Sequence, residues 1–342
     1  MCKLIFRMAK FLIGVSIAWL GLATLLPFSD SNEWWVRVWD FPRIQILALA
    51  VLFLCGLLAR LLVVRKLSRS LATALVALLL IASIQTEKII PYTALWTPEV
   101  RSAHAASADS CLKILISNVR MDNRESTTLQ RVLRREQPDV ALILENDQWW
   151  SDELAGIAAT FPHVLDIPQD NTYGMLFMTR LEPDQLEQRN LVSATIPSVR
   201  ARIRLKSGQS LTFYGIHPKP PRIGQDTDLR DRELMRVAAE IRGTDQPTVV
   251  SGDLNDVAWS STTEEFKTVA QTLDPRVGRG IYATFHAGHW YLRWPLDHVF
   301  HTGQFEIASI KLHEPIGSDH FPLTFRLCAA RTELAAQTSR AQ

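Results

Sequence analysis

The chain has 342 residues, enough for about two domains, and its 37 Lys and Arg residues nearly balance its 35 Asp and Glu residues. A formal net charge of +2 excludes a strongly basic nucleic-acid platform and an acidic tail. The first stretch of roughly ninety residues is mostly apolar, whereas the remainder alternates polar and apolar residues. We therefore expect a membrane domain over residues 1–91, followed by a water-soluble domain.

Three apolar segments occupy the membrane domain, at about residues 8–28, 41–64 and 71–90. A helix needs about 20 apolar residues to cross the hydrocarbon core of a bilayer, and the first two segments meet this length. The third is strictly apolar only over residues 71–84, so its crossing is the step on which the topology depends. Because two further apolar segments follow the first, we predict three transmembrane helices rather than a cleaved signal peptide.

The charges around these segments indicate their orientation. Basic residues precede the first segment and also separate the second from the third: Lys3, Arg7, Lys10, Arg60, Arg65, Lys66 and Arg69. The loop over residues 30–40 instead mixes three acidic residues with a single Arg and carries Trp34, Trp35 and Trp39. The positive-inside rule then predicts a multi-pass protein of a bacterial-type inner membrane or a plasma membrane, with its soluble domain on the extracytoplasmic side.

The soluble domain is expected over residues 111–330, between an Ala/Ser-rich tether at residues 92–110 and a polar tail at residues 331–342. Cys111 and Cys328 lie at its two ends. If the strands at residues 112–117 and 321–327 pair antiparallel, these cysteines fall within about one residue of each other. An extracytoplasmic location permits a disulfide between them, and two inert buried cysteines are the alternative.

Polar side chains end the first two predicted strands of the soluble domain. Asn118 follows the apolar run that starts at residue 112, and Glu145 closes the continuous apolar strand over residues 139–144. A carboxylate at the end of a buried strand is costly without a partner. Mg²⁺ is the obvious partner because it prefers oxygen ligands, although Glu145 could instead cap the helix that begins near Asp147.

Two later strands end in the same way. The strand over residues 211–216 leads to His217, and the strand over residues 248–250 leads through Gly252 to Asp253 and Asn255. Gly252 permits a sharp exit from the strand. The carboxyl ends of strands are where α/β proteins place reactive groups, so a carboxylate and a carboxamide would face one pocket there. A simple turn rich in Asp and Asn is the alternative.

Two acid–histidine pairs, Asp297-His298 and Asp319-His320, each lie where a loop meets a strand. An acid and a histidine brought together from two such elements form a pair that fixes the imidazole tautomer and raises its basicity.

In this order the motifs resemble the endonuclease/exonuclease/phosphatase superfamily, the deoxyribonuclease-like metal-dependent phosphoesterases. The resemblance covers about residues 112–327 and rests on six short motifs: Asn118, Pro138 to Glu145, His217-Pro218, Gly252 to Asn255, Asp297-His298 and Ser318 to His320. It implies an α/β fold, a four-layer αββα sandwich of two mixed β-sheets with outer helices, whose catalytic pocket lies at one edge.

The resemblance also implies a metal site. Glu145 would be the principal ligand of Mg²⁺, or of Mn²⁺ in its place, with Asn118 and Asp319 close to the metal. Some repair nucleases of the family carry a second acid where this chain has Arg120, so a second metal is in doubt.

The remaining roles follow from the same resemblance. Asp253 would orient or deprotonate the attacking water, and Asn255 would bind the transferring phosphoryl group. His217 and His320 would contact phosphate oxygens, with Asp297 holding His320. The expected activity is hydrolysis of a phosphodiester or a phosphomonoester by metal-assisted attack of water.

The substrate is less well indicated. Lys219, Arg222 and Arg230 follow His217 and could meet an anionic head group, and Trp294 could stack on a base or approach lipid. Solvated charge and core aromatics explain these residues equally well. The expected partners are a phosphate-ester substrate (lipid head group, nucleotide or nucleic acid) and the membrane, and no segment indicates an obligate protein partner. A non-catalytic scaffold that binds a phosphorylated ligand is the rival function.

Overall fold

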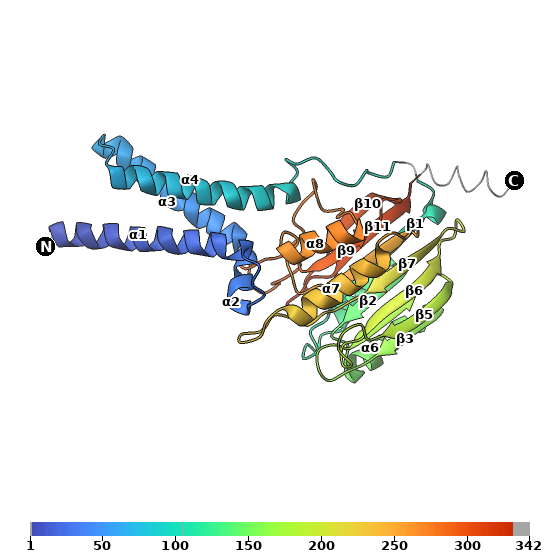
Figure 1. Ribbon diagram of the computed structural model, residues 1–342. Helices are drawn as coiled ribbons and strands as arrows, with labels where there is room; N and C mark the ends of the chain where they lie inside the picture. Colours follow the sequence, from blue (N-terminus) through green and yellow to red (C-terminus); the bar gives the residue numbers. More distant parts are fainter. Residues whose placement is uncertain (1, 105, 331–342) are drawn as a thin grey trace.

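The computed structural model describes residues 2–104 and 106–330, so the predicted tail at residues 331–342 lies outside the described part of the chain. Three long helices project together from one end of an α/β domain (Figure 1): α1 (Cys2–Leu25), α3 (Arg43–Val64) and α4 (Arg69–Ile89). The spans Arg7–Phe28, Arg43–Val64 and Arg69–Tyr92 have 22, 22 and 24 residues and are long and apolar enough to cross a membrane. The third apolar segment therefore also forms a helix long enough to cross a membrane.

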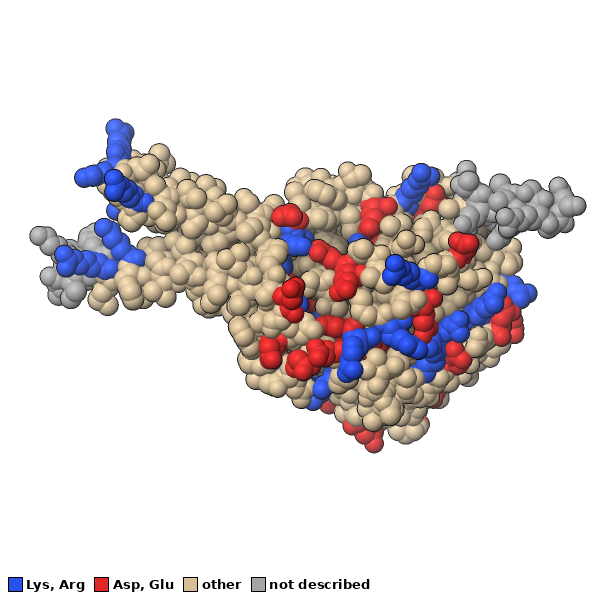
Figure 2. Space-filling model, in the orientation of Figure 1, with Lys and Arg blue, Asp and Glu red and all other residues tan. Residues whose placement is uncertain are grey.

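The charges on this bundle are confined to its ends. In Figure 2, Lys and Arg gather at the tips farthest from the α/β domain, and the helix surface behind them is uncharged. Leu20, Ile46 and Leu78 pack between the three helices. The short elements η1 (Leu26–Phe28), α2 (Trp34–Arg37) and η2 (Val38–Asp40) form the loop between α1 and α3.

Two mixed sheets form the body of the α/β domain. The first has the spatial order β10 (Phe305–Leu312), β11 (Leu323–Ala329), β1 (Cys111–Asn118), β2 (Val140–Leu144), β4 (Met175–Thr179) and β3 (His163–Ile167). The second has the order β5 (Pro183–Arg189), β6 (Ser198–Arg204), β7 (Ser210–Gly215), β8 (Thr248–Asp253) and β9 (Asp297–His301). Among these neighbours only β1 with β2 and β7 with β8 are parallel.

The two sheets pack face to face around the main core, and helices cover their outer faces. Side chains alternate between the two faces of β1: Ile114 points into the core between the sheets, and Leu115 packs towards the helices. Helices α5 (Thr127–Glu136) and α6 (Gln148–Ala158) cover the first sheet, and α7 (Asp228–Ile241) and α8 (Ser261–Ala270) cover the second. The predicted four-layer αββα sandwich is confirmed.

The first and last strands of the domain are covalently linked. Cys111 lies directly opposite Cys328 in the antiparallel pair of β1 and β11, and their sulfur atoms form a disulfide bond. The predicted disulfide is therefore present, and the predicted alignment was correct to within one residue.

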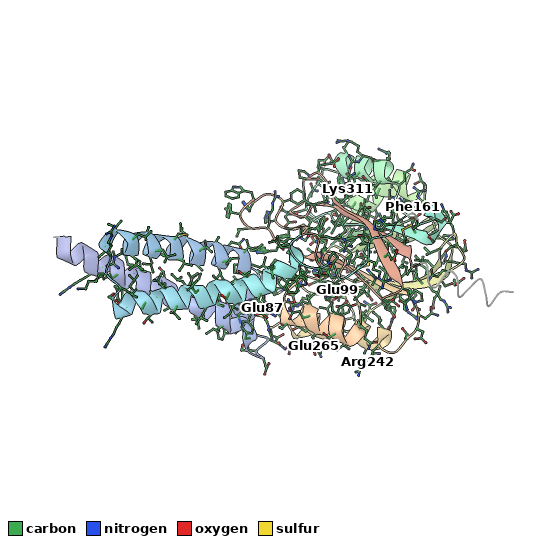
Figure 3. The ribbon with its side chains drawn as sticks, turned by 90° about the horizontal axis from the view of Figure 1, so that it is seen from above. Glu87, Glu99, Phe161, Arg242, Glu265 and Lys311 are labelled. Carbon is green, nitrogen blue, oxygen red and sulfur yellow. A yellow bond between two sulfur atoms is a disulfide. The ribbon has the colours of Figure 1, made fainter. Side chains whose placement is uncertain are left out.

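The helical bundle joins the domain through packed contacts, near Glu87 in Figure 3. The indole Nε1 of Trp259 donates to the Asp40 carbonyl at 2.8 Å, and the Tyr92 hydroxyl donates to the Ala258 carbonyl at 2.7 Å. Farther along, Val100 is buried in the core between the sheets. Three residues of the predicted tether, Tyr92, Val100 and Ser110, are thus buried, whereas most of the other described residues between them are exposed.

Candidate active site

The polar strand ends identified in the sequence meet at one edge of the sandwich. The parallel pairs bring the carboxyl ends of β1 and β2 together in one sheet and those of β7 and β8 together in the other. β9 runs antiparallel to β8, so Asp297 at its start lies directly opposite Asp253. The segment that carries His320 leads into β11, next to β1.

A glycine makes the close approach of β7 and β8 possible. Gly252 has φ of +152°, and a Cβ atom at this position would lie 1.8 Å from the Ile216 carbonyl oxygen. No side chain fits there, so the backbones that carry His217 and Asp253 can lie side by side. His217 Nε2 is 3.8 Å from Asp253 Oδ2.

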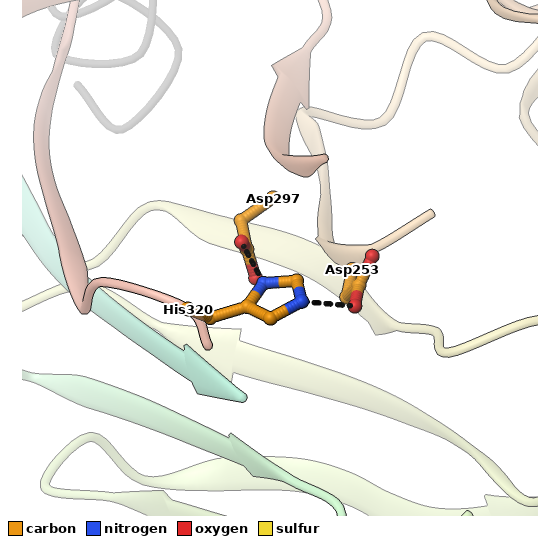
Figure 4. A group of neighbouring side chains, drawn as sticks. All are labelled: Asp253, Asp297 and His320. Carbon is orange, nitrogen blue, oxygen red and sulfur yellow. Dashed lines mark hydrogen bonds and ion pairs between the residues drawn. The ribbon is translucent and has the colours of Figure 1, made fainter. Parts of the chain in front are cut away.

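His320 lies between two carboxylates (Figure 4). Its Nδ1 donates to Asp297 Oδ2 at 2.8 Å, and its Nε2 is 3.5 Å from Asp253 Oδ2. Burial alone would lower the pKa of His320, but the Asp297 and Asp253 carboxylates outweigh it and raise that pKa to about 10. The imidazole is therefore a cation at neutral pH.

The partners of His320 are shifted as well. Burial raises the pKa of Asp253, and His320 opposes this rise. Burial would also raise the pKa of Asp297, but its charged hydrogen bond with His320 holds that pKa below the ordinary value. Burial lowers the pKa of His217, so this imidazole is neutral.

Asn118 connects the two sheets at the site. Its Nδ2 donates to Glu145 Oε1 at 2.9 Å and to Asp253 Oδ2 at 3.0 Å. Glu145 has φ of +60°, and its Oε2 accepts from the Met121 backbone at 3.2 Å. The cap of α6 is Asp147, which accepts from the Trp150 backbone at 2.9 Å, so Glu145 does not serve as the helix cap.

Glu145 and Asp319 offer carboxylate oxygens, the kind of donor that a hard divalent cation prefers. Burial raises the pKa of Glu145, the hydrogen bonds from Asn118 and Met121 oppose this rise, and the nearby Asp319 carboxylate adds to it. A cation would relieve that repulsion. Arg120 nearby is bonded to Asp122 at 2.7 Å.

Asp253, Asp297 and His320 also place one ligand atom each within 4.8 Å of one another. His320 is a poor ligand there, because a protonated imidazole has no free lone pair and both of its ring nitrogens face carboxylate oxygens. The donor chemistry therefore favours the Glu145 side of the site.

Asn255 holds together the loops that follow β7 and β8. Its backbone N–H donates to Asp253 Oδ1 at 2.9 Å, and its Nδ2 donates to the Pro218 carbonyl at 2.9 Å. The first contact orients the Asp253 carboxylate. The second fixes the loop that follows His217 and leaves one N–H of the amide for another acceptor.

The residues expected to contact substrate lie farther out. Lys219 is partly exposed, Arg222 is exposed, and the Trp294 ring stacks on Phe285 at 5.9 Å. The expectation that Arg230 could meet an anionic head group is wrong. Arg230 is buried on α7 and forms salt bridges with Asp256 and Asp231, so it cannot reach such a group. Its apolar helix face carries it into the core, where the two carboxylates neutralise it.

Sequence reasoning also missed a buried support behind Asp297. Arg276 is paired with Asp274 at 2.7 Å and donates to His298 Nδ1 at 2.6 Å and to the Asp297 carbonyl at 3.3 Å. His298 thus points away from the site, as strand alternation requires of the residue next to Asp297. No motif in the sequence marks Arg276.

Comparison with known proteins agrees with this geometry. The family model described as "Endonuclease/Exonuclease/phosphatase family" matches residues 115–320. No curated protein matches the chain.

Solved structures share the fold at low sequence identity. The human Nocturnin catalytic domain with bound sulfate has a TM-score of 0.54 and 14% identity, and the match covers 66% of this chain and 97% of that one. D. rerio TDP2 complexed with single-strand DNA product has a TM-score of 0.53 and 17% identity, with 64% and 99% covered. A Bacteroides thetaiotaomicron mannosyl-6-phosphatase has a TM-score of 0.50 and 15% identity, with 63% and 99% covered. The chain belongs to the endonuclease/exonuclease/phosphatase family.

Proposed function

We propose that the protein is a membrane-anchored, divalent-metal-dependent phosphoesterase that hydrolyses phosphodiester or phosphomonoester bonds by attack of water. The observation that carries this proposal is the convergence of Asn118, Glu145, Asp253 and the Asp297–His320 pair at one edge of the sandwich. Family membership and neighbours named as a phosphatase and as bound to a DNA product support it.

Asp253 is the proposed base. Burial raises its pKa, which makes the ionised carboxylate a better proton acceptor, and the Asn255 N–H and the Asn118 amide fix the direction of its oxygens. A water placed beside Asp253 would give up its proton to the carboxylate as its oxygen attacks phosphorus.

The two histidines are the proposed donors to phosphate. His320 is cationic because Asp297 and Asp253 stabilise its charge, so it can donate to a phosphate oxygen. His217 is neutral and buried beside Asp253, and it offers one ring N–H. The free N–H of Asn255 would bind the transferring phosphoryl group.

Glu145, with Asn118 and Asp319 close by, would hold the cation. When bound, Mg²⁺ or Mn²⁺ supplies Lewis-acid stabilisation of the negative charge that grows on the phosphoryl oxygens.

The test is a panel of phosphodiesters and phosphomonoesters offered to the full-length protein in detergent, with Mg²⁺, with EDTA, and with EDTA followed by excess Mg²⁺. We expect turnover of at least one ester, its loss with EDTA and its return with Mg²⁺. Tight binding of esters without any turnover would favour the scaffold instead.

We also propose that the α/β domain lies on the extracytoplasmic side of a bacterial-type inner membrane or a plasma membrane. Three helices that can each cross a membrane, with basic residues at the tips away from the domain, support this orientation. A reporter that works only in the cytoplasm should stay silent when fused after Gln342. A strong signal would overturn the topology.

A further inference from the structure

An apolar groove of about 440 Å³ lies where the helical bundle meets the α/β domain. One wall comes from the loop between α1 and α3, through Trp34, Val38 and Trp39. The opposite wall comes from two loops of the α/β domain, through Ile223 on one and Leu292 and Trp294 on the other. The groove thus combines elements of the membrane anchor and of the catalytic domain.

In the proposed topology, the groove lies at the level of the membrane surface. The segment that forms its first wall connects one span ending at Phe28 with the next span, which starts at Arg43. Gln45, in the first turn of that second span, donates from its Nε2 to the Tyr291 carbonyl at 2.7 Å. With the three helices in a bilayer as proposed, this bond holds the loop that carries Leu292 and Trp294 at the depth where lipid head groups meet acyl chains, the depth that Trp side chains also prefer.

The two loops of the α/β domain that line the groove continue into segments that carry proposed catalytic residues. Trp294 is three positions before Asp297, and two ring-to-ring contacts, Trp294 to Phe285 at 5.9 Å and Phe285 to His320 at 5.0 Å, connect the groove to the site. Ile223 lies in the loop that follows His217, and the Asn255 amide anchors that loop at Pro218. A molecule in the groove is therefore separated from His320 by the rings of Trp294 and Phe285.

Arg222 is the charged residue that lines the groove. Burial raises the pKa of the Tyr173 phenol, and the Arg222 guanidinium opposes that rise. The Tyr173 ring is in turn 5.9 Å from the His217 ring. An exposed guanidinium that lines an apolar groove suits a ligand with a hydrocarbon tail and an anionic head.

We propose that this groove binds the hydrocarbon tail of a membrane lipid whose head carries the phosphate ester to be hydrolysed. The assignment rests on the proposed phosphoesterase function and names its substrate class as a lipid phosphate ester taken from the bilayer. Lipid is the occupant because the groove opens at a depth where hydrocarbon chains are the surrounding solvent. Ile223 is 83% exposed, which is costly in water and favourable against acyl chains.

The kinetic test uses full-length protein in phosphatidylcholine vesicles and compares long-chain with dibutyryl forms of phosphatidic acid and of phosphatidylglycerol. The wild type should prefer the long-chain form. Ile223→Asp should lower the ratio of kcat/KM for the long-chain over the dibutyryl form by about tenfold or more, because it places a charge in the groove. The fold is not at risk, since Ile223 is exposed.

Leu95→Asp is the matched control, because Leu95 is 85% exposed and does not line the groove. Its ratio should equal that of the wild type. If Ile223→Asp leaves the ratio unchanged while turnover persists, the groove proposal is overturned and the phosphoesterase proposal stands.

A binding test that needs no turnover separates the two proposals. Phosphatidic acid with a diazirine in its acyl tail, photolysed in phosphatidylcholine vesicles with full-length protein, should label residues 34–42 and 292–294. Labelling there should fall by about tenfold in Ile223→Asp and be unchanged in Leu95→Asp. Labelling of this kind without hydrolysis of any ester would refute the phosphoesterase and retain the lipid site, and labelling confined to the outer faces of the three helices would refute the lipid site.

Discussion

At the scale of single residues, the charges around Asp253 determine which side chains of the site are protonated. One cation, His320, lies between two buried carboxylates, and one neutral donor, His217, approaches the same Asp253 oxygen, Oδ2. Each shift of pKa in this group follows from burial and from the nearest charge. Asp297 therefore does more than orient a ring, because it also sets the pH range over which His320 stays protonated.

Replacing Asp297 should expose this role. In Asp297→Asn the lost carboxylate lowers the pKa of His320, so the fall of kcat/KM at alkaline pH should begin at least about one unit below its wild-type position near pH 10. The measurement is the pH profile of kcat/KM for both proteins. An alkaline fall at the same pH in both would show that His320 protonation does not control the reaction.

Glu233 on α7 is a second unusual residue. It is buried, its Oε1 finds no hydrogen-bond partner among the described residues, and burial raises its pKa to about 8. The folded state therefore favours the neutral acid, whereas the unfolded chain ionises at the ordinary value of 4.5. Its contribution to stability is present below pH 4.5 and is lost as the pH rises towards 8.

Glu233→Gln, neutral at every pH, should remove this loss. At pH 8 we expect the variant to have a higher melting temperature than the wild type. Its free energy of unfolding should be larger by a few kcal/mol, at about 1.4 kcal/mol per unit of pKa difference, and this difference in stability should shrink at pH 5. Thermal unfolding of the full-length protein in detergent at the two pH values measures it. A gap that does not change with pH would mean that Glu233 is ionised in the fold.

At the scale of elements, the strand ends explain why so much of the site was readable from sequence. Apolar runs closed by Asn118, Glu145 and Asp253 marked the carboxyl ends of strands, and parallel pairing must bring such ends together. Arg230 and Arg276 could not be found in this way. Their places depend on which helix or loop face turns inward, and only the packed structure decides that.

The sequence did predict that the chain needs a glycine at position 252, where it leaves β8. Gly252→Ala forces a methyl group against the Ile216 carbonyl, so we expect a loss of at least about 2 kcal/mol of stability or a displaced β8 exit with much reduced activity. Gly303→Ala is the control, because a Cβ there meets nothing within 4 Å. Equal melting temperatures and activities for the two variants would contradict the close approach.

At the scale of the whole molecule, the sequence predicted two parts and the structure shows how they join. Hydropathy separates the helical bundle from the sandwich, but it does not reveal that Tyr92 and Val100 pack into the α/β domain. Isolated apolar residues in an Ala/Ser-rich stretch carry no periodicity, so their burial could not be foreseen. The segment after α4 consequently packs the helical bundle against the α/β domain.

The disulfide links the first and last strands of the α/β domain. Cys111 and Cys328 are 217 positions apart, and a bond that closes so long a loop restricts the unfolded chain strongly. Removing it by Cys328→Ser should lower stability by about 2–4 kcal/mol, read from thermal unfolding with and without reductant. The wild type should be sensitive to reductant and the variant should not. Insensitivity of the wild type would indicate that the bond does not form.

The measurement that tests the central claim most directly is the hydrolysis rate of Asp253→Asn beside the wild type, on the best ester of the panel. Asn keeps the shape of Asp253 but cannot accept the proton of water, so we predict a fall in kcat of about a thousandfold or more with an unchanged melting temperature. Asp245→Asn, at an exposed position, should leave kcat as it is. A wild-type rate in Asp253→Asn would contradict the account.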